Sequence, residues 1–288
     1  MPDTIIAVND FSYIYPNTQN RVLENITFTV SKGDFIGILG CNKAGKSTLC
    51  QSLVGVLPYL LGGSWEGDVI VDGVNLDETK GAKATDVIGI VFQDAESQFT
   101  QETVEDEIAF AMCNFGYARE LMTERIKIAS TACGLRDMLD RSPFRLSGGQ
   151  QQRLAVACVL ALQPQVVILD ESTSQLDPIG RDEVFTLVSE LNQNGTTIIM
   201  VDHNIEKIAQ YVNKVMVLHE GKLVAYDDTS VVFQMREELN RLPIRIPEVT
   251  EASLRLKDDL GLVFDNAPLN LDDAEKLFRS AKKEGGLS

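Results

Sequence analysis

A loop motif at residues 40–47 is the feature that most constrains the fold of this chain. It fits the pattern G-x-x-x-x-G-K-[ST], in which glycines let the backbone curl and point its N–H groups at phosphate oxygens. An apolar run at 35–39 precedes the motif and a helical pattern at 46–54 follows, which predicts a buried strand, a phosphate-binding loop and a helix with a positive N-terminus. The motif consists of Gly40, Cys41, Asn42, Lys43, Ala44, Gly45, Lys46 and Ser47.

Two side chains of this motif have predicted roles of their own. Lys46 can reach the β- and γ-phosphates of a nucleotide, and the Ser47 hydroxyl can bind Mg²⁺. The alternative is a glycine-rich strand–helix turn without a ligand, which the position of the motif after a buried strand and before a helix disfavours. We therefore expect a nucleoside triphosphate and Mg²⁺ as ligands.

A second candidate element is the acidic pair Asp170 and Glu171, which follows four aliphatic residues at 166–169. Such a run is typical of a strand buried on both faces, and its carboxyl end lies beside the phosphate site in folds of this kind. We expect Asp170 to hold Mg²⁺ and Glu171 to orient and deprotonate the attacking water. Alone, the pair is also compatible with a strand that leaves the core into solvent.

A third candidate element begins a strongly apolar helical pattern at 150–162. A Ser-Gly-Gly-Gln sequence at a helix start exposes N–H groups on the positive helix end, so it predicts a second phosphate-binding element. The alternative is a flexible helix cap without a ligand. The element consists of Ser147, Gly148, Gly149 and Gln150.

The apolar patterns along the chain alternate between strands and helices, which predicts an α/β fold with a mainly parallel core sheet. The expected strands lie at 5–8, 26–30, 35–39, 68–71, 87–92, 166–169, 197–201, 214–218 and 222–225. The expected helices lie at 46–54, 103 to about 140, 150–162 and 179–191.

A change in character after Asp228 divides the chain into two predicted domains. Residues 1–228 carry the motifs, with a helical subdomain at about 94–150, and residues 229–288 form a C-terminal helical extension. In the extension, Asn270 is a candidate N-cap for a last helix at 271–283, whose acidic start and basic end suit the helix dipole.

Composition disfavours some classes of function. The net charge of −16 disfavours a nucleic-acid partner, since phosphate neutralisation needs a basic surface. Residues 1–6 lack the pattern of a secretory signal, and no apolar run approaches the length of a membrane span. Five cysteines without metal-type spacing predict reduced thiols, and Cys41 in the phosphate loop is a candidate sensor of oxidation. The cysteines are Cys41, Cys50, Cys113, Cys133 and Cys158.

Together the three elements make residues 5–228 closely similar to the ABC ATPase family, whose signature motif residues 146–150 match in full. The resemblance implies a P-loop NTPase core with an antiparallel β subdomain and a helical subdomain. It also implies that two subunits, identical or paralogous, face head to tail and enclose ATP between the phosphate loop of one and the signature motif of the other.

The same resemblance implies further site residues. Tyr15 would stack on adenine and Thr48 would join the nucleotide site. Gln93 would serve both Mg²⁺ and the attacking water. Asp177 would lie in the loop that touches the other subunit, and His203 would hydrogen-bond the γ-phosphate.

Purely structural alternatives remain for two of these residues. Tyr15 is also compatible with a half-buried strand tyrosine, and Gln93 with a surface amide. Two residues depart from the family pattern. Lys43 stands where glycine is usual. A lysine there would strain the backbone if the loop requires a positive φ, or it would add positive charge near the phosphate. Ser172 stands where proline or alanine is common, and we expect little effect from it.

The sequence at 93–99 and 103–110 is similar to the ATPases of energy-coupling factor (ECF) transporters, which import vitamins and transition-metal ions into prokaryotic cells. This implies a peripheral place on the cytoplasmic face of the membrane, with a transmembrane subunit and a substrate-binding membrane subunit as partners. Another ABC importer and a non-transport cytosolic ABC ATPase remain alternatives.

In that family this region forms a groove for a helix of the transmembrane subunit. Residues that face the chain's own core instead are the alternative, which we favour for Val104 and Ile108. The candidates to line the groove are Phe99, Val104, Ile108, Met112 and Phe115.

Overall fold

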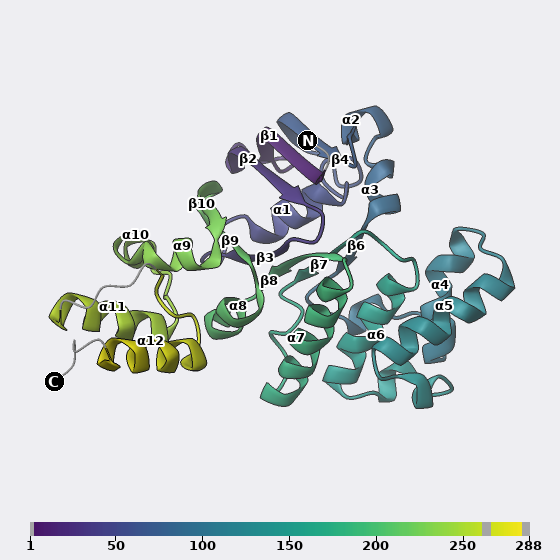
Figure 1. The fold of residues 1–288 in the computed structure, drawn as a ribbon. Coiled ribbons are helices and arrows are strands. Elements are labelled where there is room, and N and C mark those ends of the chain that lie inside the picture. Colours follow the sequence, from purple (N-terminus) through teal and green to yellow (C-terminus); the bar gives the residue numbers. More distant parts are fainter. Residues whose placement is uncertain (1–2, 261–265, 284–288) are drawn as a thin grey trace.

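The computed structural model describes residues 3–260 and 266–283, and it contains two sheets with helices on either side (Figure 1). The larger sheet has the order β10-β9-β3-β8-β7-β6, and its pairings are parallel except that of β10 with β9. This confirms the predicted α/β class with a mainly parallel sheet. Its strands are β10 (Lys222–Asp228), β9 (Lys214–His219), β3 (Phe35–Leu39), β8 (Thr197–Val201), β7 (Val166–Asp170) and β6 (Ile88–Val91).

Strands β3, β7 and β8 lie in the middle of this sheet, and every residue in them is buried. Their aliphatic runs suit this place, because a strand covered on both faces has no solvent side. Parallel strands end at the same edge of a sheet, so the residues that follow β3, β7 and β8 gather there. All the catalytic candidates except Gln93 follow directly on one of these three strands.

The smaller sheet is antiparallel, in the order β2-β1-β4-β5. It packs with helix α1 (Lys46–Leu53) and one face of the large sheet in a single apolar core. Its strands are longer than expected, because β1 continues past a register shift near Asp10, whose φ is 47°. The strands are β1 (Thr4–Ile14), β2 (Arg21–Ser31), β4 (Ser64–Val71) and β5 (Val74–Asn75), and the short helices α2 (Leu76–Thr79) and α3 (Ala82–Val87) follow.

Helices cover the other face of the large sheet, and those between β6 and β7 form a lobe at one end of the molecule (Figure 1). The helix expected from 103 to about 140 is two helices, since Gly116 ends the first with a φ of 71°. The signature helix begins earlier than expected because Ser147 caps it. The helices are α4 (Val104–Asn114), α5 (Arg119–Ala132), α6 (Gly148–Leu160), α7 (Pro178–Gln193) and α8 (Ile205–Tyr211).

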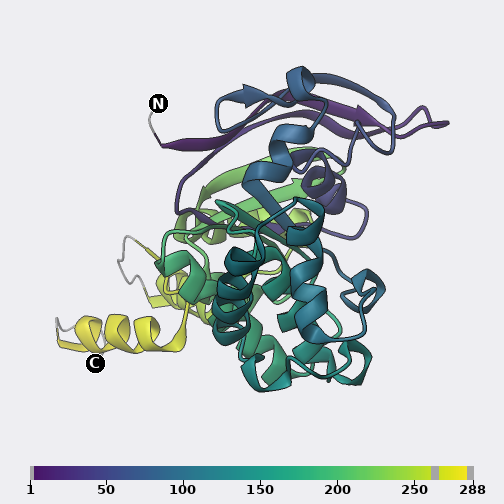
Figure 2. The same cartoon turned by 90° about the vertical axis from the view of Figure 1, so that its right-hand side faces the viewer.

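The C-terminal extension is helical, as predicted. Asn270 caps the last helix by accepting a hydrogen bond from Asp273 N at 2.9 Å. Phe233, Leu239 and Ile246 are buried in the same core as α4 to α7, whereas α12 projects from the body (Figure 2). The helices are α9 (Thr229–Gln234), α10 (Arg236–Arg241), α11 (Glu248–Leu260) and α12 (Leu271–Lys283).

Within residues 3–260 and 266–283, no helix has the combined length and apolarity that a bilayer crossing demands.

Candidate functional site

The phosphate loop connects β3 to α1 and wraps around the side chain of Lys46. Lys46 is only 5% exposed, and its Nζ donates to Gly40 O at 3.1 Å and Cys41 O at 3.2 Å. Gly45 has a φ of 101°, and a Cβ there would lie 2.8 Å from Leu23 Cδ2. The loop therefore needs glycine at this position both for its backbone conformation and for space.

A tight turn inside the loop holds Lys43 in the left-handed region. Ala44 N donates to Cys41 O at 3.1 Å, which makes Asn42 and Lys43 the two central residues of a β-turn. The φ of Lys43 is 67°, the sign that a type II turn requires at its second central residue. Glycine is favoured there, so the departure noted in the sequence places a strained lysine in the phosphate loop.

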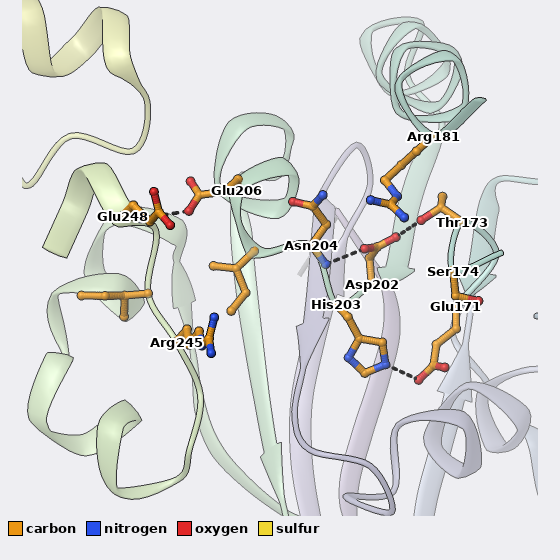
Figure 3. Close-up of a pocket in the computed structure, with 12 residues that line it drawn as sticks. Glu171, Thr173, Ser174, Arg181, Asp202, His203, Asn204, Glu206, Arg245 and Glu248 are labelled. Carbon is orange, nitrogen blue, oxygen red and sulfur yellow. Dashed lines mark hydrogen bonds and ion pairs between the residues drawn. The ribbon is translucent and has the colours of Figure 1, made fainter. Parts of the chain in front are cut away.

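Glu171 lies between two cationic or hydrogen-bonding side chains. Its Oε1 is 3.1 Å from His203 Nε2 (Figure 3), and it is 3.4 Å from Lys46 Nζ. The φ of Glu171 is 52°, so the chain turns sharply where β7 ends, and Glu171 N is held by Val201 O of β8 at 3.0 Å. The backbone thus directs this carboxylate at the phosphate loop rather than into solvent.

Ser47 and Asp170 face each other beside this carboxylate. Ser47 Oγ donates to Asp170 Oδ1 at 3.0 Å. Burial raises the pKa of the Asp170 carboxyl above its ordinary value, although the Ser47 hydrogen bond acts in the opposite direction. A hydroxyl and a carboxylate form a set of hard oxygen ligands that fits Mg²⁺.

Asp202 is a residue of this site for which no role was predicted from the sequence. Its Oδ2 accepts a hydrogen bond from Thr173 Oγ1, and its Oδ1 accepts one from Asn204 N at 2.7 Å. These bonds fix the backbone on both sides of His203 and so orient the imidazole (Figure 3). The signal was present in the sequence, because Asp202 and Thr173 follow two adjacent parallel strands.

Tyr15 and Thr48 lie at another side of the loop. The Tyr15 hydroxyl is 3.1 Å from Thr48 Oγ1, and its ring packs edge-on against Tyr13 with centroids 5.0 Å apart. Tyr15 is half-buried and directly follows β1, so its side chain reaches the helix that begins at Lys46. Its stacking on adenine stays a prediction.

The signature residues form a separate cluster. Ser147 Oγ accepts from Gln150 N at 3.3 Å, and Gln150 Oε1 accepts from Ser147 N at 3.0 Å, which is a capping box at the start of α6. A Cβ at Gly148 would lie 3.7 Å from Leu176, and one at Gly149 would lie 3.4 Å from the Cα of Gly180. The start of α6 thus packs beside the start of α7.

Asp177 belongs to this second cluster, because it caps α7 by accepting from Gly180 N at 2.8 Å. Gln93 lies at an exposed position just after β6, whose Val91 pairs with Leu169 of β7, so it lies beside the strand end that carries Asp170 and Glu171. The structure therefore brings together Lys46, Ser47, Asp170, Glu171 and His203, and it brings Ser147 to Gln150 together with Asp177.

The candidate groove residues are mostly buried. Phe99 is 7% exposed, whereas Val104, Ile108 and Met112 are fully buried in the core. This confirms the alternative favoured for Val104 and Ile108 and overturns the groove expectation for Phe99 and Met112, whose side chains fill the space between α4 and its neighbours. Phe115 is 53% exposed.

A buried carboxylate that the sequence did not single out holds the loop before α4. Glu107 is 6% exposed, and its Oε2 accepts from Thr100 N and Gln101 N at 2.8 Å each. The loop between Gln93 and α4 is therefore fixed from the helix that follows it.

A family model described as ABC transporter matches residues 23–174, more than half of the chain. The chain belongs to the ABC transporter family. It is an ATP-binding, ATP-hydrolysing protein of that family, because the matched segment contains the phosphate loop and the acidic pair.

Relatives extend this likeness over almost the whole of this ABC ATPase. A Pyrococcus abyssi protein, named provisionally as an ABC transporter ATP-binding protein, is 41% identical over 88% of this chain and 91% of the relative. The energy-coupling factor transporter ATP-binding protein EcfA1 of Bacillus subtilis is 36% identical over 94% of this chain and 95% of the relative.

A solved structure agrees with these relatives. It is CbiO1 from Clostridium perfringens, whose title calls it part of the ABC transporter complex cbiONQ. The TM-score is 0.74 at 30% identity, over 90% of this chain and all of that one. Because residues 1–228 make up less than this share of the chain, the likeness includes part of the C-terminal extension as well as the ATPase core.

Proposed function

We propose that this chain powers an energy-coupling factor type importer of a vitamin or metal ion, by hydrolysing ATP in a head-to-tail dimer. The observation that carries the dimer is the separation of the two phosphate-binding elements. Lys46 lies in a cluster with Glu171 and His203, whereas Ser147 lies in another cluster beside the start of α7 and lines neither hollow next to His203. Each element is half of a site that a second subunit would complete.

The residues of the first cluster divide the work of hydrolysis. Lys46 and the loop N–H groups bind the β- and γ-phosphates, and His203 Nε2 is placed to hydrogen-bond the γ-phosphate. Glu171 holds the attacking water and takes its proton. The Glu171 backbone is held by Val201 O, which fixes the carboxylate for this task.

Mg²⁺ would be held by Ser47 and Asp170, with Gln93 as a further ligand from β6. When bound, the ion neutralises phosphate charge and polarises the bond that breaks. Ser47 and Asp170 are already within hydrogen-bonding distance of each other, so the oxygen ligands converge on one place.

The second subunit would supply Ser147, Gly148 and Gly149 from the start of α6 to the same phosphate. Asp177 in the adjacent loop would touch the first subunit. The relatives named for energy-coupling factor transport support membrane subunits as further partners, and with them a place on the cytoplasmic face of a prokaryotic membrane. The exposed Phe115 is a candidate contact for the transmembrane subunit.

The test of the catalytic assignment is Glu171→Gln. The variant keeps the shape of the side chain but cannot take a proton, so we expect MgATP binding to persist and phosphate release to stop. Glu124→Gln on the exposed face of α5 is the matched control and should hydrolyse ATP at the wild-type rate. Normal turnover by Glu171→Gln would contradict the assignment.

The test of the shared site uses two defective variants. Gel filtration of Glu171→Gln in MgATP first establishes whether the chain pairs with itself. Mixing Lys46→Ala with Ser147→Arg then creates mixed dimers in which one site carries both defects and the other carries none. Recovered hydrolysis supports a site shared between chains, and inactivity of the mixture beside an active wild type argues that Lys46 and Ser147 act within one chain.

A further inference from the structure

The segment at 242–247 joins α10 to α11, which begins at Glu248, and lies beside the phosphate loop. Cys41 Sγ donates to Leu242 O at 3.5 Å, which connects its beginning to the loop. Glu248 N donates to Glu206 Oε1 at 2.9 Å, which connects its end to α8 just beyond His203. The C-terminal extension is therefore held against the nucleotide site at two points.

The direction of the Arg245 side chain follows from the burial of its neighbours. Ile244 is 6% exposed and Ile246 is 7% exposed, and both belong to the core that lies under the sheet. Arg245 between them is exposed, so its side chain points away from that core. Figure 3 shows it across the hollow from His203 and Glu171, with its guanidinium turned toward them.

Two adjoining hollows share Arg245. One, of about 510 Å³, is lined by Glu171, Ser174 and Glu248 among others. The other, of about 360 Å³, is lined by Gly40, Cys41 and Asn42 of the phosphate loop. Asp202, His203, Ile205 and Arg245 line both. Arg245 thus lies at the border between the phosphate loop and the proposed catalytic carboxylate.

Four carboxylates line the hollows that Arg245 borders, and three of them already have other donors, whereas Glu248 lines only the larger hollow. Glu171 is taken by Lys46 and His203, Asp202 by Thr173 and Asn204 N, and Glu206 by Glu248 N. Arg245 itself has no hydrogen-bond or ion-pair partner within the part of the chain that the structure describes.

A guanidinium without a carboxylate partner, beside backbone N–H groups, favours an anion. Arginine binds phosphate through two parallel hydrogen bonds, which gives both strength and a fixed orientation. Of the residues that line the smaller hollow, Asp202 alone is acidic, and both of its oxygens already accept hydrogen bonds. The phosphate-loop side of Arg245 is therefore the side on which an anion would be bound.

We propose that Arg245 of the C-terminal extension is a second phosphate-binding cation of the nucleotide site, acting beside Lys46 of the phosphate loop. This rests on the proposed function, since the anion is either the terminal phosphate of ATP or the phosphate released from it. Through Arg245 the extension distinguishes a site with that phosphate from a site without it.

The experiment compares Arg245→Ala, Arg245→Lys and the control Arg241→Ala. Arg241 lies in the same extension, has a side chain that is 76% exposed, and lines neither hollow. Dissociation constants for MgATP and MgADP come from displacement of a fluorescent nucleotide, and inhibition of hydrolysis by inorganic phosphate is measured on the same proteins. Thermal midpoints show that each variant is folded.

If Arg245 holds the terminal phosphate, Arg245→Ala weakens MgATP about tenfold, as expected for one charged hydrogen bond, and leaves MgADP unchanged. If it holds the released phosphate, MgATP is unchanged and inhibition by inorganic phosphate weakens instead. Arg245→Lys recovers part of either effect, and Arg241→Ala has none.

Equal losses for MgATP and MgADP would indicate a purely structural role and overturn the proposal, as would no change in any of the three ligands. Failure of the proposed function looks different, because wild type itself would then bind no MgATP or release no phosphate.

Discussion

Replacing Lys43 by glycine should stabilise the protein, although glycine normally has the opposite effect. Lys43 is exposed, has a φ of 67°, and has no partner among residues 3–260 and 266–283. A non-glycine residue in the left-handed region costs about 1–2 kcal/mol. Glycine enlarges the freedom of the unfolded chain, which costs about 0.4–1 kcal/mol. The difference leaves roughly 0.5–1 kcal/mol in favour of Lys43→Gly.

The assay is thermal unfolding of the protein without nucleotide. For a domain of this size 1 kcal/mol shifts the midpoint by about 2–4 °C, so we expect Lys43→Gly to raise it by roughly 1–4 °C. Asn42→Gly is the matched control, because Asn42 is equally exposed one position earlier but is not among the described residues with positive φ. It should lower the midpoint.

A midpoint for Lys43→Gly at or below that of wild type would refute the strain argument. ATP affinity measured on the same variant tests the other hypothesis for Lys43, that its charge strengthens phosphate binding. Unchanged ATP affinity would exclude a role of the Lys43 charge in phosphate binding, and the effect of Lys43 would then be that of the turn conformation alone.

Three further predictions concern buried groups. Asp170→Asn should raise the thermal midpoint measured without nucleotide and should abolish the further rise that MgATP gives. Burial raises the pKa of Asp170, so the ionised carboxylate destabilises the fold increasingly as pH rises from its unfolded pKa to its folded pKa. A higher thermal midpoint for wild type than for Asp170→Asn at neutral pH, without nucleotide, would contradict this. Alkylation at pH 8 should spare Cys133, whose pKa burial raises to about 12, and should modify Cys41 only when MgATP is absent; modification of Cys41 indifferent to MgATP would count against nucleotide in the loop. Glu107→Ala should cost about 2 kcal/mol in unfolding free energy because two backbone N–H groups lose their acceptor, whereas the exposed Glu105→Ala should cost little; equal effects would show that the loop does not depend on Glu107.

The sequence predicted best where local pattern and tertiary environment agree. Strands β3, β7 and β8 were recognised because a run of aliphatic residues suits only a strand covered on both faces. The phosphate loop and the signature helix start were recognised because glycine and helix-capping residues act within a few positions of themselves.

Predictions failed where the deciding contact is distant or where one residue breaks a pattern. Gly116 divides the long helical stretch, and its neighbours gave no sign of the turn. Met112 was assigned to a groove because an apolar stripe on a helix does not show whether a partner or the chain's own core covers it. The contact of Cys41 with Leu242 joins residues 201 positions apart, and no local pattern encodes it.

The apolar core on the helical side of the sheet runs without interruption from Met112 in α4, through Leu169 and Met200 in the sheet, to Ile246 beside Arg245. Close-packed interiors are nearly incompressible, so a push on one end is passed along rather than absorbed. A force applied to the α4 lobe from outside would therefore reach the part of the extension beside Arg245 through solid packing, and a change at the phosphate loop would travel back by the same route.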